Sequence, residues 1–289
     1  MQRLYKVIRK RFALNSIPEK LRSGRPMKRL LRKLALSKSE RRLLEFGARH
    51  LAPMSQTLPE DIFIAGYPKS GNSWFQDLVA GLVFGVLPDK SHPKLVNDLV
   101  PDIHDDSFYR RYCDPTFFKT HHLPRPEYRR VVYLLRDGRD AMVSYWHHLK
   151  ALSRKDIDFL QLVKTGEGLY PSKWHEHVAA WRANPHGAEM MVIKYEDLLT
   201  DPANQMERFC TFAGVEAEPD FVRMIVERTS FAKLQNREKR LGETSEQWPK
   251  DKLFRRRGVA GSFRDEMPEE VQQAFLAEAG ATLKSEGYA

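Results

Sequence analysis

One stretch, residues 61–83, constrains the fold most strongly, because it joins a short apolar run to a helical pattern through a glycine-containing turn. The apolar run at 62–65 suits a strand buried in a parallel sheet. Gly66 and Gly71 interrupt regular structure after it, and apolar residues recur at helical spacing over 74–82. In such a unit the backbone N–H groups of the turn and the helix N-terminus attract an anion. The stretch therefore predicts a phosphate-binding turn.

The turn is close to a Walker A loop but departs from it at one position. Gly66, Gly71 and Ser73 match the spacing G-x-x-x-x-G-K-[ST], whereas Asn72 stands where that motif has its lysine. A lysine lies three residues earlier, at Lys69. This departure argues against Mg²⁺-assisted chemistry on a nucleoside triphosphate. A P-loop nucleoside kinase or nucleoside triphosphatase stays open as an alternative, and so does an ordinary turn of an α/β protein.

The positive charge of the chain is concentrated near its N-terminus. The 289 residues carry a formal net charge of +10 at pH 7. Residues 1–50 hold 16 Lys and Arg against 3 Glu, so the remainder, with 32 basic and 35 acidic residues, is slightly acidic. We therefore expect a basic N-terminal arm at 1–57, with amphipathic helical stripes, and one domain at 58–289.

Three roles stay open for this arm: packing on the domain, lying on an anionic membrane surface, and binding nucleic acid. The arm lacks aromatic interleaving, which argues against nucleic acid, so peripheral membrane contact is the functional alternative to packing. No apolar run approaches the ~20 residues that span a bilayer. The two cysteines, Cys113 and Cys210, follow no disulfide or metal-ligand spacing. We expect a cytoplasmic location, with membrane association through the arm as a variant of it.

Two later segments place polar residues beside strands. Residues 117–123 favour a strand in which Lys119 and His121 share a face, where they suit an electrophile and a general base. Ordinary surface polarity is the alternative there. Arg136 follows the apolar run of a second strand, at the end where ligands of open α/β sheets gather. Ser144 lies about two helical turns later and suits a phosphate together with Arg136; a helix cap with salt bridges is the alternative.

Two polar segments, 84–115 and 234–257, look irregular, and we expect substrate-side loops in both, the second one mobile. Three arginines at 255–257 precede Gly258. This pattern predicts an anion site, because the guanidinium fork suits phosphate and glycine lets the backbone approach. A solvated basic turn is the alternative. A third strand is expected at 189–195.

Together and in this order, the segments resemble the sulfotransferases that use 3′-phosphoadenosine 5′-phosphosulfate (PAPS), most closely the cytosolic type. The resemblance covers roughly residues 58–265. It implies an α/β fold with a central, mostly parallel sheet flanked by helices and a P-loop-like donor site at the strand ends. The matching segments are YPKSGNSW (67–74), FKTHHLP (118–124), VVYLLRDGRDAMVSYWHH (131–148), YEDLLTDP (195–202), RTSF (228–231) and RRRGVAGSF (255–263).

The resemblance also implies roles for individual residues. His121 is implied as the base that takes the acceptor's proton, Lys119 as a stabiliser of the moving sulfuryl group, and Lys69 as a partner of the leaving oxygen. The turn would hold the 5′-phosphosulfate, aromatic residues the adenine, and arginines with a serine the 3′-phosphate. The implied donor-binding residues are Lys69, Ser70, Gly71, Asn72, Ser73, Trp74, Arg136, Ser144, Tyr195, Thr229, Phe231, Arg256, Arg257 and Gly258.

The implied reaction transfers a sulfuryl group from PAPS to a hydroxyl or amine of a small-molecule, lipid or carbohydrate acceptor. No metal is required, because the donor carries its own activated leaving group. Asn72 and Ser73 stand where the family commonly has two threonines, and both keep hydrogen-bonding capacity. His122 is a second candidate for the base. A non-catalytic binding protein that uses the basic arm remains a further alternative.

Overall fold

The computed structural model describes residues 51–105, 107–153, 156–242 and 248–288. They fall into two compact units. The first contains residues 51–57 together with Ile103–Asp114, and the second contains Leu58–Asp102 together with the residues from Pro115 onward. The amphipathic helices expected in the arm, and its membrane contact, lie outside the described residues, and the arm-and-domain division at residue 57 stays a prediction.

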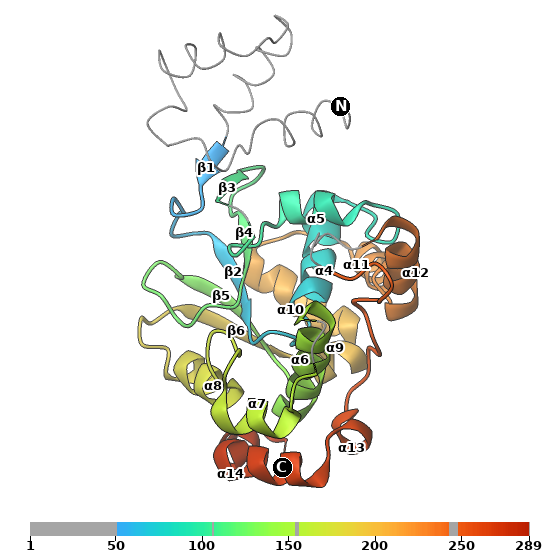
Figure 1. Cartoon of the computed structure of the whole chain (residues 1–289). Coiled ribbons are helices and arrows are strands. Elements are labelled where there is room, and N and C mark those ends of the chain that lie inside the picture. The colour runs from blue at the N-terminus through green and yellow to red at the C-terminus, as the bar shows by residue number, and fades with distance from the viewer. Residues whose placement is uncertain (1–50, 106, 154–155, 243–247, 289) are drawn as a thin grey trace, which may run out of the picture. The chain divides into compact units, whose positions relative to one another are not determined.

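A four-stranded parallel sheet forms the centre of the second unit, with helices on both sides of it (Figure 1). Every residue of the strand at 62–66 is buried, so both of its faces are covered, which explains its continuous apolar sequence. The predicted α/β fold with a central parallel sheet is therefore confirmed. The strands, in their spatial order, are β4 (Phe117–Thr120), β2 (Ile62–Gly66), β5 (Arg130–Leu135) and β6 (Glu189–Lys194).

Helices occupy most of the remaining second unit, and several begin or end at the expected residue types. Asp201 accepts a hydrogen bond from Asn204 N at the start of a helix whose first residue is Pro202. The helices are α4 (Asn72–Phe84), α5 (Pro93–Leu99), α6 (Gly138–Ser153), α7 (Phe159–Thr165), α8 (Trp174–Ala183), α9 (Tyr195–Thr200), α10 (Pro202–Ala213), α11 (Pro219–Arg228), α12 (Phe231–Leu241), α13 (Phe263–Glu266) and α14 (Glu269–Ser285).

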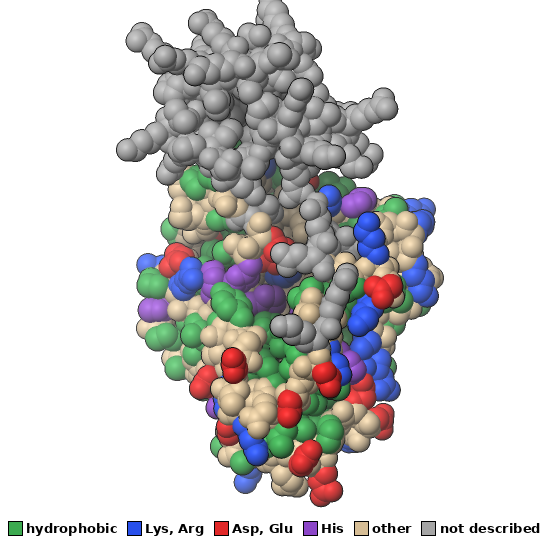
Figure 2. All heavy atoms as spheres, viewed as in Figure 1, with side chains coloured by type: hydrophobic (Ala, Val, Ile, Leu, Met, Phe, Trp, Pro, Cys, Tyr) green, Lys and Arg blue, Asp and Glu red, His purple; other side chains and the backbone are tan. Residues whose placement is uncertain are grey.

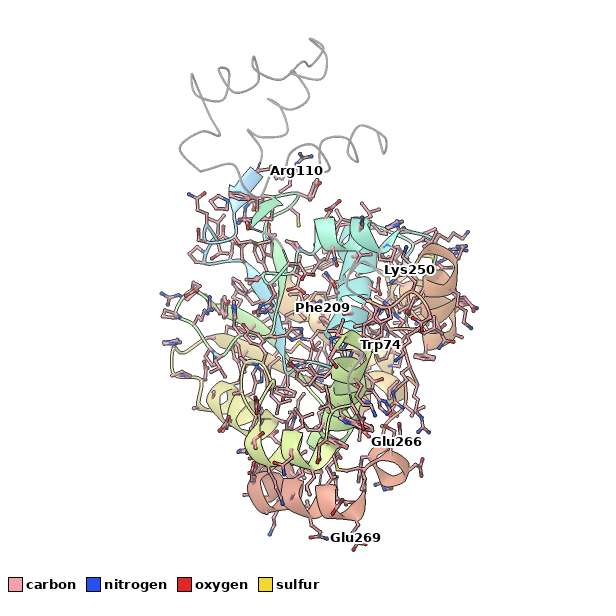
Figure 3. The ribbon with its side chains drawn as sticks, in the orientation of Figure 1. Trp74, Arg110, Phe209, Lys250, Glu266 and Glu269 are labelled. Carbon is pink, nitrogen blue, oxygen red and sulfur yellow. The ribbon has the colours of Figure 1, made fainter. Side chains whose placement is uncertain are left out.

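Aromatic side chains fill the core on both sides of the sheet. Phe209 of α10, labelled in Figure 3, packs against Phe75 of α4 and Phe117 of β4, with ring centroids 5.3 and 5.9 Å away. Trp174 and Trp181 of α8 are each 1% exposed, so both belong to the core. None of the described helices has the length and apolarity needed to cross a membrane.

The first unit contains a small antiparallel ladder. Strand β1 (Leu51–Pro53) pairs with β3 (Phe108–Arg110), which lies in the segment expected to be irregular. The hydroxyl of Tyr109 donates to the carbonyl of Gln56 at 2.6 Å and joins the two segments.

The prediction of two irregular loops is wrong in part. Besides β3, the segment 84–115 contains α5, which begins after His92, whose Nδ1 accepts a hydrogen bond from Lys94 N. The segment 234–257 begins inside α12, which continues to Leu241. Its sequence reads as a polar loop because the buried face of α12 carries charged Arg237, which is 2% exposed.

A buried ion pair joins α12 to α4, the helix that follows the glycine-containing turn. Arg237 Nη1 and Nη2 donate to Asp77 Oδ1 and Oδ2 at 2.6 and 3.0 Å, and Nη1 also donates to the carbonyl of Pro88. Arg255 Nη2 reaches the same carboxylate at 3.1 Å. Because the pair is shielded from water, removal of one partner leaves the other as an uncompensated charge.

Asp77→Ala is expected to lower the free energy of unfolding by about 3–5 kcal/mol, because Arg237 would stay buried without its carboxylate. Urea denaturation followed by circular dichroism measures the change. Asp220→Ala is the matched control: Asp220 pairs with Arg223 on the surface of α11, and its loss should cost less than about 1 kcal/mol. Equal losses in the two variants would contradict the role given to the buried pair.

Candidate functional site

The turn between β2 and α4 has an unusual backbone. Lys69 and Gly71 have φ angles of 72° and 96°, and Lys69 is one of two described non-glycine residues with positive φ. Such conformations are costly for a residue with a side chain and collect at ligand-binding turns. Gly71 has no side chain to cap α4, so the first N–H groups of the helix face the turn. A Cβ on Gly71 would lie 2.8 Å from the ring of Tyr195, which explains the glycine.

Several buried polar atoms around this turn have no hydrogen-bond partner among the described residues. They are Ser70 Oγ, both amide atoms of Asn72, Trp74 Nε1 and Arg136 Nε. Buried polar groups are nearly always hydrogen-bonded, so a cluster of unsatisfied ones marks a place where a polar ligand would complete the bonding. Ser73, the next residue of the turn, is partly exposed. The turn thus fits an anion that offers several oxygens.

Arg136 connects this turn to the neighbouring strand end and to a distant loop. Its Nη1 donates to the carbonyl of Lys69 at 2.9 Å, and its Nη2 donates to the carbonyl of Val259 at 3.1 Å. The guanidinium lies 4.3 Å from the ring centroid of Tyr195, which makes an edge contact with Trp74 at 5.9 Å. The structure therefore brings together Arg136, Tyr195 and Trp74, which the sequence analysis assigned to one site.

The loop at 258–263 is held against the start of α6 by one carboxylate. Fully buried Asp140 accepts hydrogen bonds from Gly261 N, Phe263 N and Ser262 Oγ at 2.6, 2.9 and 3.1 Å. Because the loop is fixed at these points, Gly258 lies against the ring of Phe231, where a Cβ would come within 2.2 Å. Phe231, implied for the adenine, and Gly258, implied for the 3′-phosphate, are therefore direct neighbours.

The three arginines before this loop have different partners. Arg255 is tied to Asp77 and Glu238, so it holds α4 and α12 together. Arg256 and Arg257 are exposed and both pair with Glu266 of α13, labelled in Figure 3. The run of three arginines alone did not separate the first from the other two, whereas the resemblance implied only Arg256 and Arg257 as donor-binding residues.

Two other residues that the resemblance implied for binding the sulfuryl donor are Thr229 and Ser144. Thr229 is fully buried, and its hydroxyl lies within hydrogen-bond distance of two carbonyl groups at the end of α11. Ser144 is partly exposed on α6, one turn before His147, which contacts Glu266 at 3.0 Å. Because Glu266 also holds Arg256 and Arg257, it brings these arginines to the middle of α6, near Ser144.

His121 lies just beyond the end of β4 and is oriented by the neighbouring strand. Its Nδ1 is 2.8 Å from the carbonyl oxygen of Gly66, the last residue of β2. A carbonyl only accepts, so Nδ1 carries the proton of this bond, and in the neutral ring Nε2 carries the lone pair. Figure 2 shows histidine side chains gathered near the middle of one face. His121 therefore presents a basic nitrogen close to the start of the turn.

Residues around His121 differ in their partners. Lys119, the expected electrophile, forms an ion pair with Asp102 at 2.7 Å. His122 Nδ1 lies 2.6 Å from the hydroxyl of Tyr128. Burial lowers the pKa of His177 to about 3, so this ring stays neutral. Nothing in the sequence indicated that a carboxylate would pair with Lys119, because Asp102 lies 17 residues away in an irregular segment.

An aromatic group that the sequence motifs did not indicate lies against Lys69. The Lys69 ammonium lies 4.0 Å from the ring centroid of Phe254, which makes an edge contact with Trp248 at 5.3 Å. Trp248 stacks on His148 at 5.2 Å. Burial, and then the charge of Lys69, lowers the pKa of His148 to about 3. In the sequence, this contact could have been inferred from Trp248 and Phe254, the two aromatic residues within the charged stretch 248–257.

The sequence model of one protein family, the sulfotransferase domain, matches residues 59–284. The chain belongs to the sulfotransferase family and is a sulfotransferase enzyme, which confirms the resemblance. Sulfotransferase 1E1 of Mus musculus is 23% identical over 256 residues, which make up 75% of this chain and 81% of that protein. Cytosolic sulfotransferase 11 of Arabidopsis thaliana is 26% identical over 247 residues, or 74% of this chain and 70% of that protein.

A solved structure agrees with the fold. The crystal structure of retinol dehydratase in complex with androsterone and the inactive cofactor PAP superimposes with a TM-score of 0.62 at 24% identity, covering 79% of this chain and 82% of that one. The central parallel sheet with flanking helices is thus shared with a known structure. Within the described residues, no group of three or more His, Cys, Asp or Glu is arranged to hold a metal ion.

Gly258→Ala is expected to lower the free energy of unfolding by about 1–3 kcal/mol more than Gly214→Ala, because only the first places a Cβ against a ring. The two glycines have similar φ angles, 67° and 69°, so alanine incurs similar left-handed strain at both. A Cβ on Gly214 would meet nothing within 4 Å. Chemical denaturation of both variants measures the difference, and identical losses would show that Gly258 is not required by packing on Phe231.

Proposed function

We propose that this enzyme transfers a sulfuryl group from PAPS to a hydroxyl group of a small, largely apolar acceptor. The observation that carries the proposal is the cluster of unsatisfied buried polar atoms around the turn after β2, where Arg136 is bonded to the carbonyl of Lys69 and His121 to that of Gly66. The retinol dehydratase structure contains PAP, the desulfated form of this donor. The family assignment replaces the kinase alternative, which the missing Walker lysine already disfavoured.

The donor would be held by groups that follow three strand ends, by Ser144 of α6, by the junction of α11 and α12, and by the loop at 256–258. Backbone N–H groups at the start of α4, with Ser70, Asn72 and Ser73, suit the 5′-phosphosulfate. Trp74, Tyr195 and Phe231 supply aromatic surface for an adenine, with Thr229 beside them. Arg136 and Ser144, with Arg256, Arg257 and Gly258, suit the 3′-phosphate.

The transfer would use His121 as the general base. Nε2 accepts the proton of the acceptor hydroxyl, while the acceptor oxygen bonds to sulfur and the bond from sulfur to the bridging phosphate oxygen breaks. The carbonyl of Gly66 stabilises the protonated ring through Nδ1–H. Lys69 would neutralise charge on the leaving oxygen, and Lys119, held by Asp102, would stabilise the sulfuryl group in transit.

The proposed acceptor class follows from two observations. Retinol dehydratase holds androsterone, an apolar molecule with a hydroxyl group. In this chain, Phe254 and Trp248 provide aromatic surface beside Lys69, where transfer would occur. An acceptor with an apolar body and a single reactive hydroxyl therefore suits the site better than a carbohydrate does. Because its relatives include a cytosolic sulfotransferase, we propose a cytoplasmic location.

His121→Ala is expected to lower kcat by about 10²–10⁴-fold, because the acceptor hydroxyl loses its base. His122→Ala, which removes the neighbouring ring bonded to Tyr128, should stay within about tenfold of the parent enzyme. Initial rates with ³⁵S-labelled PAPS and a panel of hydroxysteroids and phenols measure both. Full turnover by the His121 variant would show that another group is the base, and loss in the His122 variant alone would transfer the role to His122.

Adenosine 3′,5′-bisphosphate is expected to bind at least about tenfold more tightly than adenosine 5′-monophosphate, and without Mg²⁺, because only the bisphosphate engages the arginines. Ser144→Ala should weaken binding of the bisphosphate roughly two- to tenfold, which is the contribution of one hydrogen bond. The affinity for the monophosphate should stay unchanged. Ser285→Ala on α14 is the control for removal of an exposed hydroxyl. Calorimetric titration measures these affinities; preference for ATP with Mg²⁺ would contradict the donor assignment.

A further inference from the structure

Glu266 is the only described acidic residue that pairs with both Arg256 and Arg257. Its Oε1 accepts from Arg257 Nη1 at 2.8 Å, and its Oε2 accepts from Arg256 Nη1. The opposing effect of burial is outweighed by the hydrogen bonds from Arg256 and Arg257, so the pKa of Glu266 is lowered and its carboxylate is charged at neutral pH. The two arginines that suit the 3′-phosphate are thus already bound to an anion of this chain.

We propose that Glu266 is a resident counter-ion that competes with the 3′-phosphate of the donor for Arg256 and Arg257. The inference rests on the proposed function, because it assigns the 3′-phosphate to these arginines. Binding of a 3′-phosphorylated nucleotide exchanges one set of charge-assisted hydrogen bonds for another. The apparent affinity for such a nucleotide is reduced by the fraction of molecules in which Glu266 holds the arginines.

The exchange is feasible because the pairs are partly solvated. The side chains of Arg256 and Arg257 are 32% and 41% exposed, so water takes part in breaking and remaking their bonds. Arg255, the preceding residue, is bound to Asp77 and Glu238 and holds the backbone in place while the next two side chains move. The buried pair of Arg237 with Asp77 has no such exposure and cannot exchange in this way.

Glu266 keeps a partner when the arginines leave it. His147 Nε2 lies 3.0 Å from Oε2, and His147 stands one turn after Ser144 on α6. The carboxylate is therefore not stranded by the exchange, and it stays beside the place that the 3′-phosphate would occupy. From there it can recover Arg256 and Arg257 as the product leaves, since adenosine 3′,5′-bisphosphate keeps its 3′-phosphate. Glu266 thus limits product retention as well as donor affinity.

The test is calorimetric titration of the full chain with adenosine 3′,5′-bisphosphate and with adenosine 5′-monophosphate. Glu266→Gln removes the charge and keeps the size, and it is expected to bind the bisphosphate about three- to fivefold more tightly, the upper part of the range for a partly exposed charged pair. Affinity for the monophosphate, which has no group for these arginines, should stay unchanged. A residue that only supported the fold would alter both nucleotides together.

Asp265→Asn is the matched control. It makes the same change in net charge on the same short helix, but Asp265 is 72% exposed and reaches Arg257 only at 3.7 Å, so the affinity for either nucleotide should stay within twofold. Glu266→Ala serves as a second variant with the same expected direction, and circular dichroism checks the fold of each protein.

Two outcomes would overturn the inference in distinguishable ways. If the parent enzyme prefers the bisphosphate but Glu266→Gln binds it equally or more weakly, the donor site stands and Glu266 only supports the arginines. If the parent enzyme binds the two nucleotides equally, the arginines do not read a 3′-phosphate, and the donor assignment fails together with the inference.

Discussion

The geometry of the proposed donor site depends on the buried carboxylate of Asp140. A fully buried carboxylate is stable only when its oxygens are hydrogen-bonded, and here all three donors come from residues 261–263, more than 120 positions later in the chain. Asp140 lies in the first turn of α6, where the helix dipole also favours a negative charge. These bonds place Val259, whose carbonyl accepts from Arg136, and Gly258, which packs on Phe231. Loss of this one carboxylate would release a whole side of the site.

The parts of the fold that the sequence predicted are those determined by local interactions. The strands of the sheet were visible as apolar runs, because both faces of a central parallel strand are buried. The turn after β2 was visible as glycines between a strand and a helix, and its left-handed Lys69 and Gly71 agree with a ligand-binding conformation. The strand expected at 189–195 ends one residue earlier, since Tyr195 already begins α9. The class of enzyme was predictable as well, because several motifs of one family occur in this chain in the same order.

The parts that the sequence did not predict are determined by pairs of charges far apart in the chain. A lysine and a histidine two residues apart suggested catalysis, but nothing local indicated that Asp102 would neutralise Lys119. The helix α12 was taken for a loop because its buried face carries Arg237, whose partner Asp77 lies 160 residues earlier. Apolar patterning misses such a helix, since the pattern assumes that buried faces are apolar. Long-range electrostatic complementarity can be recognised only once the fold brings the partners together.

The arginines at 255–257 have the same side chain but differ in solvent exposure, which separates the structural role of the first from the binding role proposed for the other two. Arg255 is 11% exposed and bound to two carboxylates with little exposure of their own, so any ligand would have to displace bonds that water cannot replace. Arg256 and Arg257 are partly solvated, and their bonds can be exchanged at little cost. One run of three identical side chains thus anchors the loop at its first residue and leaves the next two able to bind an anion. A loop that must hold its backbone still while its side chains change partners needs both kinds of contact in adjacent positions.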